Sequence, residues 1–157
     1  MDGSLLLGAI SGLVGTVIIT ILSYFLNIAG HTLDLPYLLG ARFVDIKDKA
    51  KVYTAGLLLH LLAGAAWGAM YILTITAMGI QAHWPAGILW GFAHGIFVGV
   101  MLGLLSDDHP HIGEGKLIDD PGIMGRRWSP LMPYWILGLH VIFGVVTLFT
   151  YRFLFTP

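Results

Sequence analysis

The sequence predicts an all-α membrane protein with four transmembrane helices, arranged as two parallel helical hairpins. Hydrophobic residues make up 57% of the chain and charged residues only 11%, whereas a soluble globular chain carries about 25% charged residues. The apolar residues gather in four stretches, each close to the roughly 20 residues that a membrane-spanning helix needs. A pattern of glycine and histidine repeats between the two halves. We therefore expect residues 1–157 to form a single transmembrane domain.

The four spans follow from the apolar stretches in chain order. The first, 5–27, has no basic segment before it and is longer than the apolar core of a usual signal peptide, so we expect it to be retained. The other spans are expected at 54–78, 86–106 and 133–154. None of the four has Asp, Glu or Lys in its interior. Arg152 lies near the end of the last span, where its long side chain can reach the interface.

Basic residues predict how the chain is oriented. The two long connections, 28–53 and 107–132, carry seven of the eight Lys and Arg residues. Loops rich in Lys and Arg remain on the cytoplasmic side. We therefore expect these two loops in the cytoplasm and both termini outside. The seven residues are Arg42, Lys47, Lys49, Lys51, Lys116, Arg126 and Arg127.

An internal repeat relates residues 1–78 to residues 80–157. The pattern His-x3-Gly-x6-Tyr occurs in the second span and again in the fourth, and the first and third spans share three further positions. Because the spans alternate in direction, such halves are parallel repeats about an axis along the membrane normal. Glycines at four-residue spacing are typical of closely packed helices. The matched residues are His60, Gly64 and Tyr71 with His140, Gly144 and Tyr151, and Gly8, Gly12 and Gly15 with Gly87, Gly91 and His94.

The two repeated histidines are the first candidate site. A histidine inside a membrane is costly to maintain and is a candidate functional residue. His60 and His140 lie at similar depth on helices that run in the same direction, and two neutral imidazoles from different helices suit a haem b iron. A quinone contact or an interhelical hydrogen bond is the alternative. The predicted cofactor-binding residues are the ligands His60 and His140, the neighbouring Gly64 and Gly144, and the propionate-facing Arg126 and Arg127.

A second candidate metal site follows the third span. Histidine and carboxylate at short spacing suit zinc or a di-iron centre. Polar residues after a helix are also ordinary solvated loop residues, which is the alternative interpretation. The residues are Asp107, Asp108, His109 and His111, with Glu114 nearby and with His31 and Asp34 on the same side of the membrane.

The chain resembles a family of small bacterial four-helix integral membrane proteins known only as a domain of unknown function. The resemblance implies the fold and a location in the bacterial inner membrane, with several membrane passes. It implies no activity, and loop 107–132 is longer than the family pattern. The motifs that carry it are Gly8-x3-Gly12-x2-Gly15-Thr16, Leu33-Asp34-Leu35-Pro36 with Leu39-Gly40, His60-x3-Gly64-x2-Trp67-Gly68-x2-Tyr71, and His140-x3-Gly144.

For function, we expect a small integral subunit of a larger membrane complex of respiratory or photosynthetic electron transfer, with a structural or accessory role. The expected partners are the lipid bilayer and other membrane subunits. Two alternatives remain: a protein that binds haem b or a quinone through His60 and His140, and a small oligomeric transporter with His94 in its path. No enzyme signature is present. The chain has no cysteine, which excludes thiolate chemistry, and its net charge of −1 gives no reason to expect nucleic acid as a partner.

The predicted orientation can be tested by labelling single cysteines. Cysteine placed at Lys49 should be labelled only from the cytoplasm, and cysteine placed at Ser4 only from outside, because basic loops remain inside. The measurement is modification of intact cells and of inverted vesicles with a thiol reagent that does not cross membranes. Labelling of the Lys49→Cys variant from outside intact cells would overturn the assignment.

Overall fold

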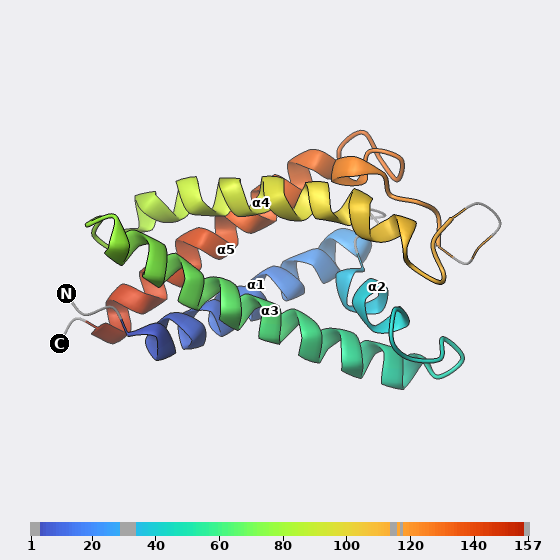
Figure 1. Ribbon diagram of the computed structural model, residues 1–157, viewed down its shortest axis with the longest axis horizontal. Coiled ribbons are helices and arrows are strands. Elements are labelled where there is room, and N and C mark those ends of the chain that lie inside the picture. The colour runs from blue at the N-terminus through green and yellow to red at the C-terminus, as the bar shows by residue number, and fades with distance from the viewer. Residues whose placement is uncertain (1–3, 29–33, 114–115, 117, 156–157) are drawn as a thin grey trace.

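The computed structural model describes residues 4–28, 34–113, 116 and 118–155, which form a bundle of long helices (Figure 1). Four of these helices are long and apolar enough to cross a membrane. The predicted all-α membrane fold is therefore confirmed. The elements are α1 (Leu5–Ile28), α2 (Leu35–Ala41), α3 (Lys49–Ala77), α4 (Trp84–Asp107), the short 3-10 helix η1 (Ile123–Gly125) and α5 (Met132–Phe155).

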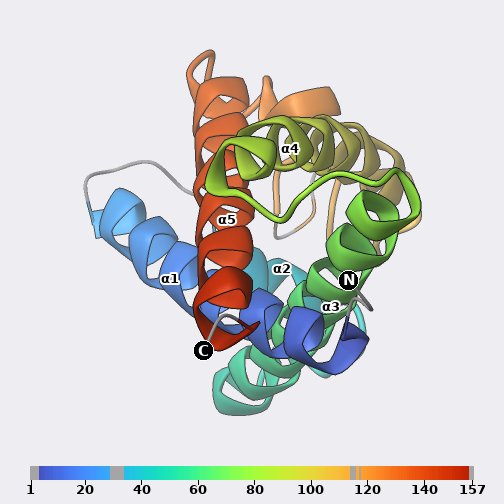
Figure 2. The ribbon, with the colours of Figure 1, turned by 90° about the vertical axis from the view of Figure 1, so that its left-hand side faces the viewer.

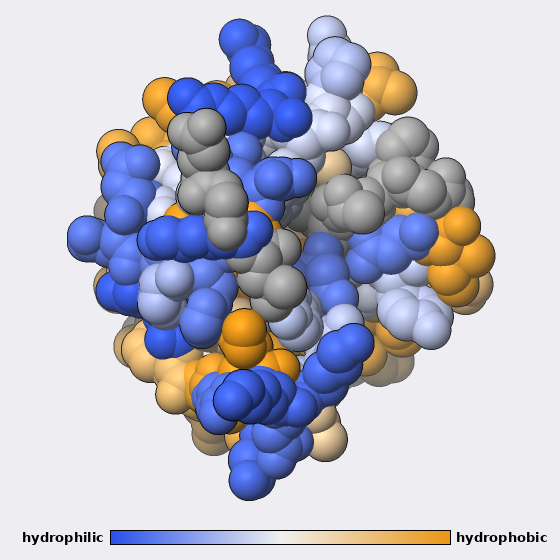
Figure 3. Space-filling model, turned by 90° about the vertical axis from the view of Figure 1, so that its right-hand side faces the viewer, coloured by the Kyte–Doolittle hydropathy of each residue, from blue (hydrophilic) through white to orange (hydrophobic). Residues whose placement is uncertain are grey.

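The long helices alternate in direction and give the bundle two different ends. At one end, here called the terminal end, α1 begins, α3 connects to α4, and α5 ends (Figure 1). There the Ser4 amide donates to the Tyr151 hydroxyl over 3.1 Å, and Arg152 contacts the His83 ring. The opposite end, the loop end, holds α2, η1 and the seven basic residues. Hydrophilic side chains gather on its surface (Figure 3).

The helices pack in the order α3, α1, α5, α4, so that α5 contacts both α1 and α4. Figure 2, which faces the terminal end, shows this arrangement. Helix α2 packs against α3 at the loop end. Helices α3 and α4 are neighbours at their connection but diverge toward the loop end (Figure 1). The bundle is therefore closed on three sides by direct helix packing and is wider between α3 and α4.

Glycine permits the closest contacts in both hairpins. A Cβ atom on Gly12 of α1 would lie 2.1 Å from the carbonyl oxygen of Gly64 in α3. A Cβ atom on Gly91 of α4 would lie 2.3 Å from the carbonyl oxygen of His140 in α5. Only a residue without a side chain allows two backbones to approach so closely. These glycines therefore lie in helix-packing contacts, as the sequence predicts.

The two hairpins use different registers at these contacts. In α1 and α3, the position of a Gly12 Cβ falls against Gly64 and Gly68. In α4 and α5, the equivalent Gly91 falls against His140, which corresponds to His60 in the repeat. The second hairpin is thus shifted by four residues, about one helical turn. His60 and His140 accordingly pack differently against their partner helices.

Loop 28–53 contains more helix than the sequence predicted. Asp34 caps α2 by accepting a hydrogen bond from the Tyr37 amide over 3.1 Å. Asp48 caps α3 in the same way, accepting from the Lys51 amide over 3.1 Å, so α3 begins before the predicted residue 54. Both Asp residues are typical N-caps. This start sequence, Asp34-Leu35-Pro36, lies within the stretch that the apolar pattern predicts as a connection.

Alanine substitution at a packed glycine should destabilise the bundle. Gly12→Ala places a methyl group within 2.1 Å of the Gly64 carbonyl oxygen, and such overpacking costs about 1–3 kcal/mol. Gly138→Ala is the matched control, because nothing lies within 4 Å of a Cβ atom there. Thermal unfolding in detergent, followed by circular dichroism, should give a lower Tm for Gly12→Ala alone. Equal Tm values for the two variants would contradict this packing.

Candidate functional site

A cavity of about 370 Å³ lies inside the bundle, between all four long helices and α2. Its walls are largely apolar, and aromatic rings from α3, α4 and α5 contribute to them. Cavities of this size are typical of small-molecule sites. The polar residues that line it are Thr16, Arg42, His60, His94, Ser106, His109 and His140.

His60 enters the cavity from α3 and is held by α1. Its Nδ1 lies 3.2 Å from the Thr20 hydroxyl oxygen. The Thr20 hydroxyl proton is already donated to the Thr16 carbonyl oxygen, over 2.7 Å. The hydroxyl therefore accepts from His60, and Nδ1 carries the proton. In the neutral ring, Nε2 is then an acceptor.

His140 has the same tautomer for a different reason. Its Nδ1 lies 2.7 Å from the carbonyl oxygen of Ile136, one turn earlier in α5. A carbonyl oxygen only accepts, so Nδ1 must donate and Nε2 of the neutral ring is an acceptor. Both predicted histidines thus line one cavity, and each donates its Nδ1 proton to an oxygen atom of the protein.

His94 of α4 is a third imidazole in the cavity. Its ring stacks on Trp67 with centroids 3.9 Å apart, and it contacts the His140 ring at 4.7 Å, nearly perpendicular. Its Nδ1 shares a hydrogen bond of 3.1 Å with the Tyr71 hydroxyl. In the repeat, His94 corresponds to Gly15 and therefore has no matching histidine. The signal that could have found this cluster is the Trp67-x3-Tyr71 spacing, which places both rings on one face of α3.

No family model, curated protein or solved structure matches this chain. The resemblance to bacterial four-helix proteins stays a prediction.

The two glycines predicted to border a cofactor lie instead in contacts between helices. A Cβ atom on Gly64 would lie 1.6 Å from the Thr16 hydroxyl oxygen, and one on Gly144 would lie 2.1 Å from the Gly87 carbonyl oxygen. Gly64 also borders the cavity. The space beside Gly144 is therefore filled by α4.

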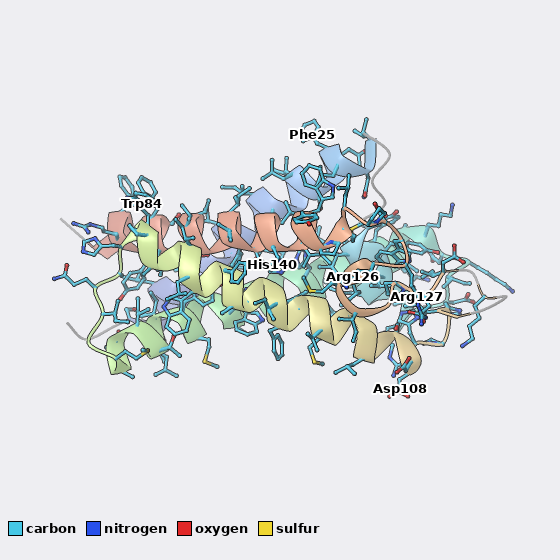
Figure 4. The ribbon with its side chains drawn as sticks, turned by 90° about the horizontal axis from the view of Figure 1, so that it is seen from above. Phe25, Trp84, Asp108, Arg126, Arg127 and His140 are labelled. Atoms are coloured by element: carbon cyan, nitrogen blue, oxygen red, sulfur yellow. The ribbon has the colours of Figure 1, made fainter. Side chains whose placement is uncertain are left out.

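The two predicted propionate-facing arginines lie away from the histidine cavity. Arg127 makes an ion pair with Asp120 within the loop before α5. Arg126 borders a separate depression with Pro130 and Tyr134. Figure 4 shows both arginines toward the loop end and His140 about midway along the bundle. The basic residue that does line the cavity is Arg42.

The residues after α4 that were predicted as a second metal site help to close the loop end of the bundle, because they connect α2 with the end of α4. Arg42 donates to the Asp108 carbonyl oxygen, which ties the end of α2 to the end of α4. His109 donates from Nε2 to the Leu38 carbonyl oxygen over 3.1 Å, and its Nδ1 accepts from the His111 amide over 3.2 Å. Both His109 nitrogens are therefore engaged in protein contacts.

A metal centre is not assembled in this region. Among residues 4–28, 34–113, 116 and 118–155, no group of three or more histidine or acidic side chains is placed to hold a metal ion. Asp107 and Asp108 end α4, and the His109 ring accepts from the backbone amide of His111. Two neighbouring candidates, Glu114 and His31, lie outside the described residues.

The closure by His109 should weaken at low pH. Burial lowers the pKa of His109, the hydrogen bond to Leu38 opposes this shift, and the charges of Arg42, His111 and Lys116 reinforce it. A histidine whose folded pKa is depressed adds stability above its unfolded pKa of 6.5, and this stability is lost as the pH falls below it.

The measurement is Tm in detergent between pH 7.5 and pH 5, for the wild type and for His109→Gln, which stays neutral. The wild type should lose several degrees more than the variant. Parallel pH profiles would show that His109 is not responsible.

Proposed function

We propose that this protein binds a lipid-soluble molecule of the quinone class in the histidine cavity. One observation carries the proposal: three imidazoles and the flat rings of Trp67 and Phe143 meet around an apolar cavity between membrane-spanning helices. An aromatic headgroup can stack on such rings. The imidazoles supply the few polar contacts that orient a ligand in an apolar pocket.

The cavity is accessible from the side of the bundle. Ala63 of α3 and Phe97 of α4 both line it and are both exposed, and Phe97 is 50% exposed. They lie on the two helices that diverge (Figure 1). An opening between two membrane-spanning helices faces lipid, so a hydrophobic molecule can enter from the bilayer without crossing water.

Haem b is the second candidate, favoured by the histidine tautomers. Iron-binding histidines usually donate their other nitrogen to an oxygen acceptor, as His60 and His140 do. One feature favours the quinone class instead. The space beside Gly144, one turn after His140 in α5, is filled by helix packing, so a flat macrocycle has no room there. A Soret band in the absorption spectrum of the purified protein would favour haem.

The other predicted functions have less geometric support. Exposed apolar side chains cover the long helices, and they suit lipid as well as another subunit, so an accessory role in electron transfer stays a prediction. For transport, a path would have to pass the terminal side of the cavity. There Tyr71 and Phe143 are in edge-to-face contact at 5.7 Å.

Binding of a decyl-substituted benzoquinone, in its oxidised or its reduced form, tests the proposal. The measurement is isothermal titration calorimetry in lipid nanodiscs, with empty nanodiscs as the background. The wild type should bind at least one form saturably. His60→Leu and His140→Leu should each weaken binding by up to about tenfold, the effect of one lost hydrogen bond.

His83→Leu is the matched control. His83 lies at the terminal end, where it bonds to Gln81 and contacts Arg152, and it does not line the cavity. This variant should bind like the wild type. The proposal fails if neither form of the probe binds, or if all three leucine variants lose affinity equally.

A further inference from the structure

Two of the four histidines that line the cavity present only an acceptor to an occupant. Within the described residues, His60 and His140 each make one hydrogen bond, and each makes it through Nδ1. Both line the cavity and are less than one-tenth exposed. Their neutral rings therefore offer an Nε2 lone pair, and no donor, to a bound molecule.

From these tautomers we infer that the cavity selects the hydroxyl-bearing form of its ligand, a hydroquinone, over the carbonyl-bearing quinone. This inference rests on the proposed function and specifies its ligand. A hydroquinone hydroxyl donates to an Nε2 lone pair. A quinone carbonyl has only lone pairs, which would face the lone pair of the imidazole. No redox step is involved, because the inference concerns binding alone.

The apolar surroundings make this difference large. A buried acceptor without a donor costs free energy, since no water replaces the missing partner. The walls beside the histidines are apolar side chains such as Ile19, Leu102 and Phe143. A quinone in this position would leave both its own oxygen and the imidazole nitrogen unsatisfied. A hydroquinone satisfies both.

Thr20 is the positioning residue for His60. Its hydroxyl proton is committed to the Thr16 carbonyl oxygen at 2.7 Å, so its oxygen can only accept from His60. Removing the hydroxyl releases the His60 ring to carry its proton on Nε2, where it could donate to a quinone carbonyl. Because Ile136 holds the His140 tautomer through a backbone oxygen, Thr20 is the side chain through which the selectivity can be changed.

Three probes with the same ring and decyl tail test the inference: the benzoquinone, its hydroquinone and the dimethyl ether of that hydroquinone. The titrations are done without oxygen, by calorimetry in nanodiscs. The hydroquinone should bind about tenfold or more tightly than the quinone. The dimethyl ether, which has no donor, should bind as weakly as the quinone or more weakly.

The outcomes separate this inference from the proposed function. Equal binding of hydroquinone and quinone, tighter quinone binding, or a dimethyl ether as tight as the hydroquinone overturns the selectivity but leaves the binding function standing. Failure of all three probes to bind overturns both.

Variants at Thr20 provide a readout that a general structural defect would not give. Thr20→Val should reduce the hydroquinone-to-quinone affinity ratio several-fold. Thr20→Ser, which keeps the hydroxyl, should have the same ratio as the wild type. The ratio compares two ligands on one protein, so a loss of folded protein affects both equally. An unchanged ratio in Thr20→Val would show that Thr20 does not set the His60 tautomer.

Discussion

The close approach of helix backbones at glycine is the constraint on which the rest of the structure depends. Gly12 allows α1 to lie against α3, and Gly91 allows α4 to lie against α5. These two pairs pack against each other through α1 and α5. Helices α3 and α4 therefore form the fourth side of the bundle. These two helices diverge toward the loop end, and the Trp67 and His94 rings stack between them. The cavity lies beside these stacked rings.

Hydrogen bonding then determines what the cavity can recognise. In a membrane interior, each polar group must find a partner within the protein or in a ligand. His60 and His140 use one nitrogen for α1 and for their own helix respectively, and they leave the other for the cavity. At the loop end, His109 donates from Nε2 to the Leu38 carbonyl oxygen of α2 and accepts at Nδ1 from the His111 amide. The same residue type thus lines the cavity in one place and ties structural elements together in another.

Much of the fold follows from the sequence, because the apolar stretches are long and carry few charges. His60 and His140, which the repeat singled out, line one cavity, and their role there stays a prediction. What the sequence left open depends on register and rotamer. Nothing in the repeat indicated that the second hairpin is shifted by a turn, which brings His94 against His140. Likewise, the sequence does not show that Arg42, and not Arg126, lines the cavity. Arg42 is placed there by α2, a helix too short to give a periodic signal.

Photoaffinity labelling tests the central claim, that the histidine cavity is a ligand site, most directly. The probe is the decyl hydroquinone with a diazirine in its tail, applied to protein in nanodiscs, and the labelled residues are located by mass spectrometry. The account predicts labelling within 60–67 of α3 and 94–101 of α4, which excess unlabelled hydroquinone should prevent. Labelling confined to exposed α1 side chains such as Leu6 and Val17, with no protection by excess ligand, would contradict it.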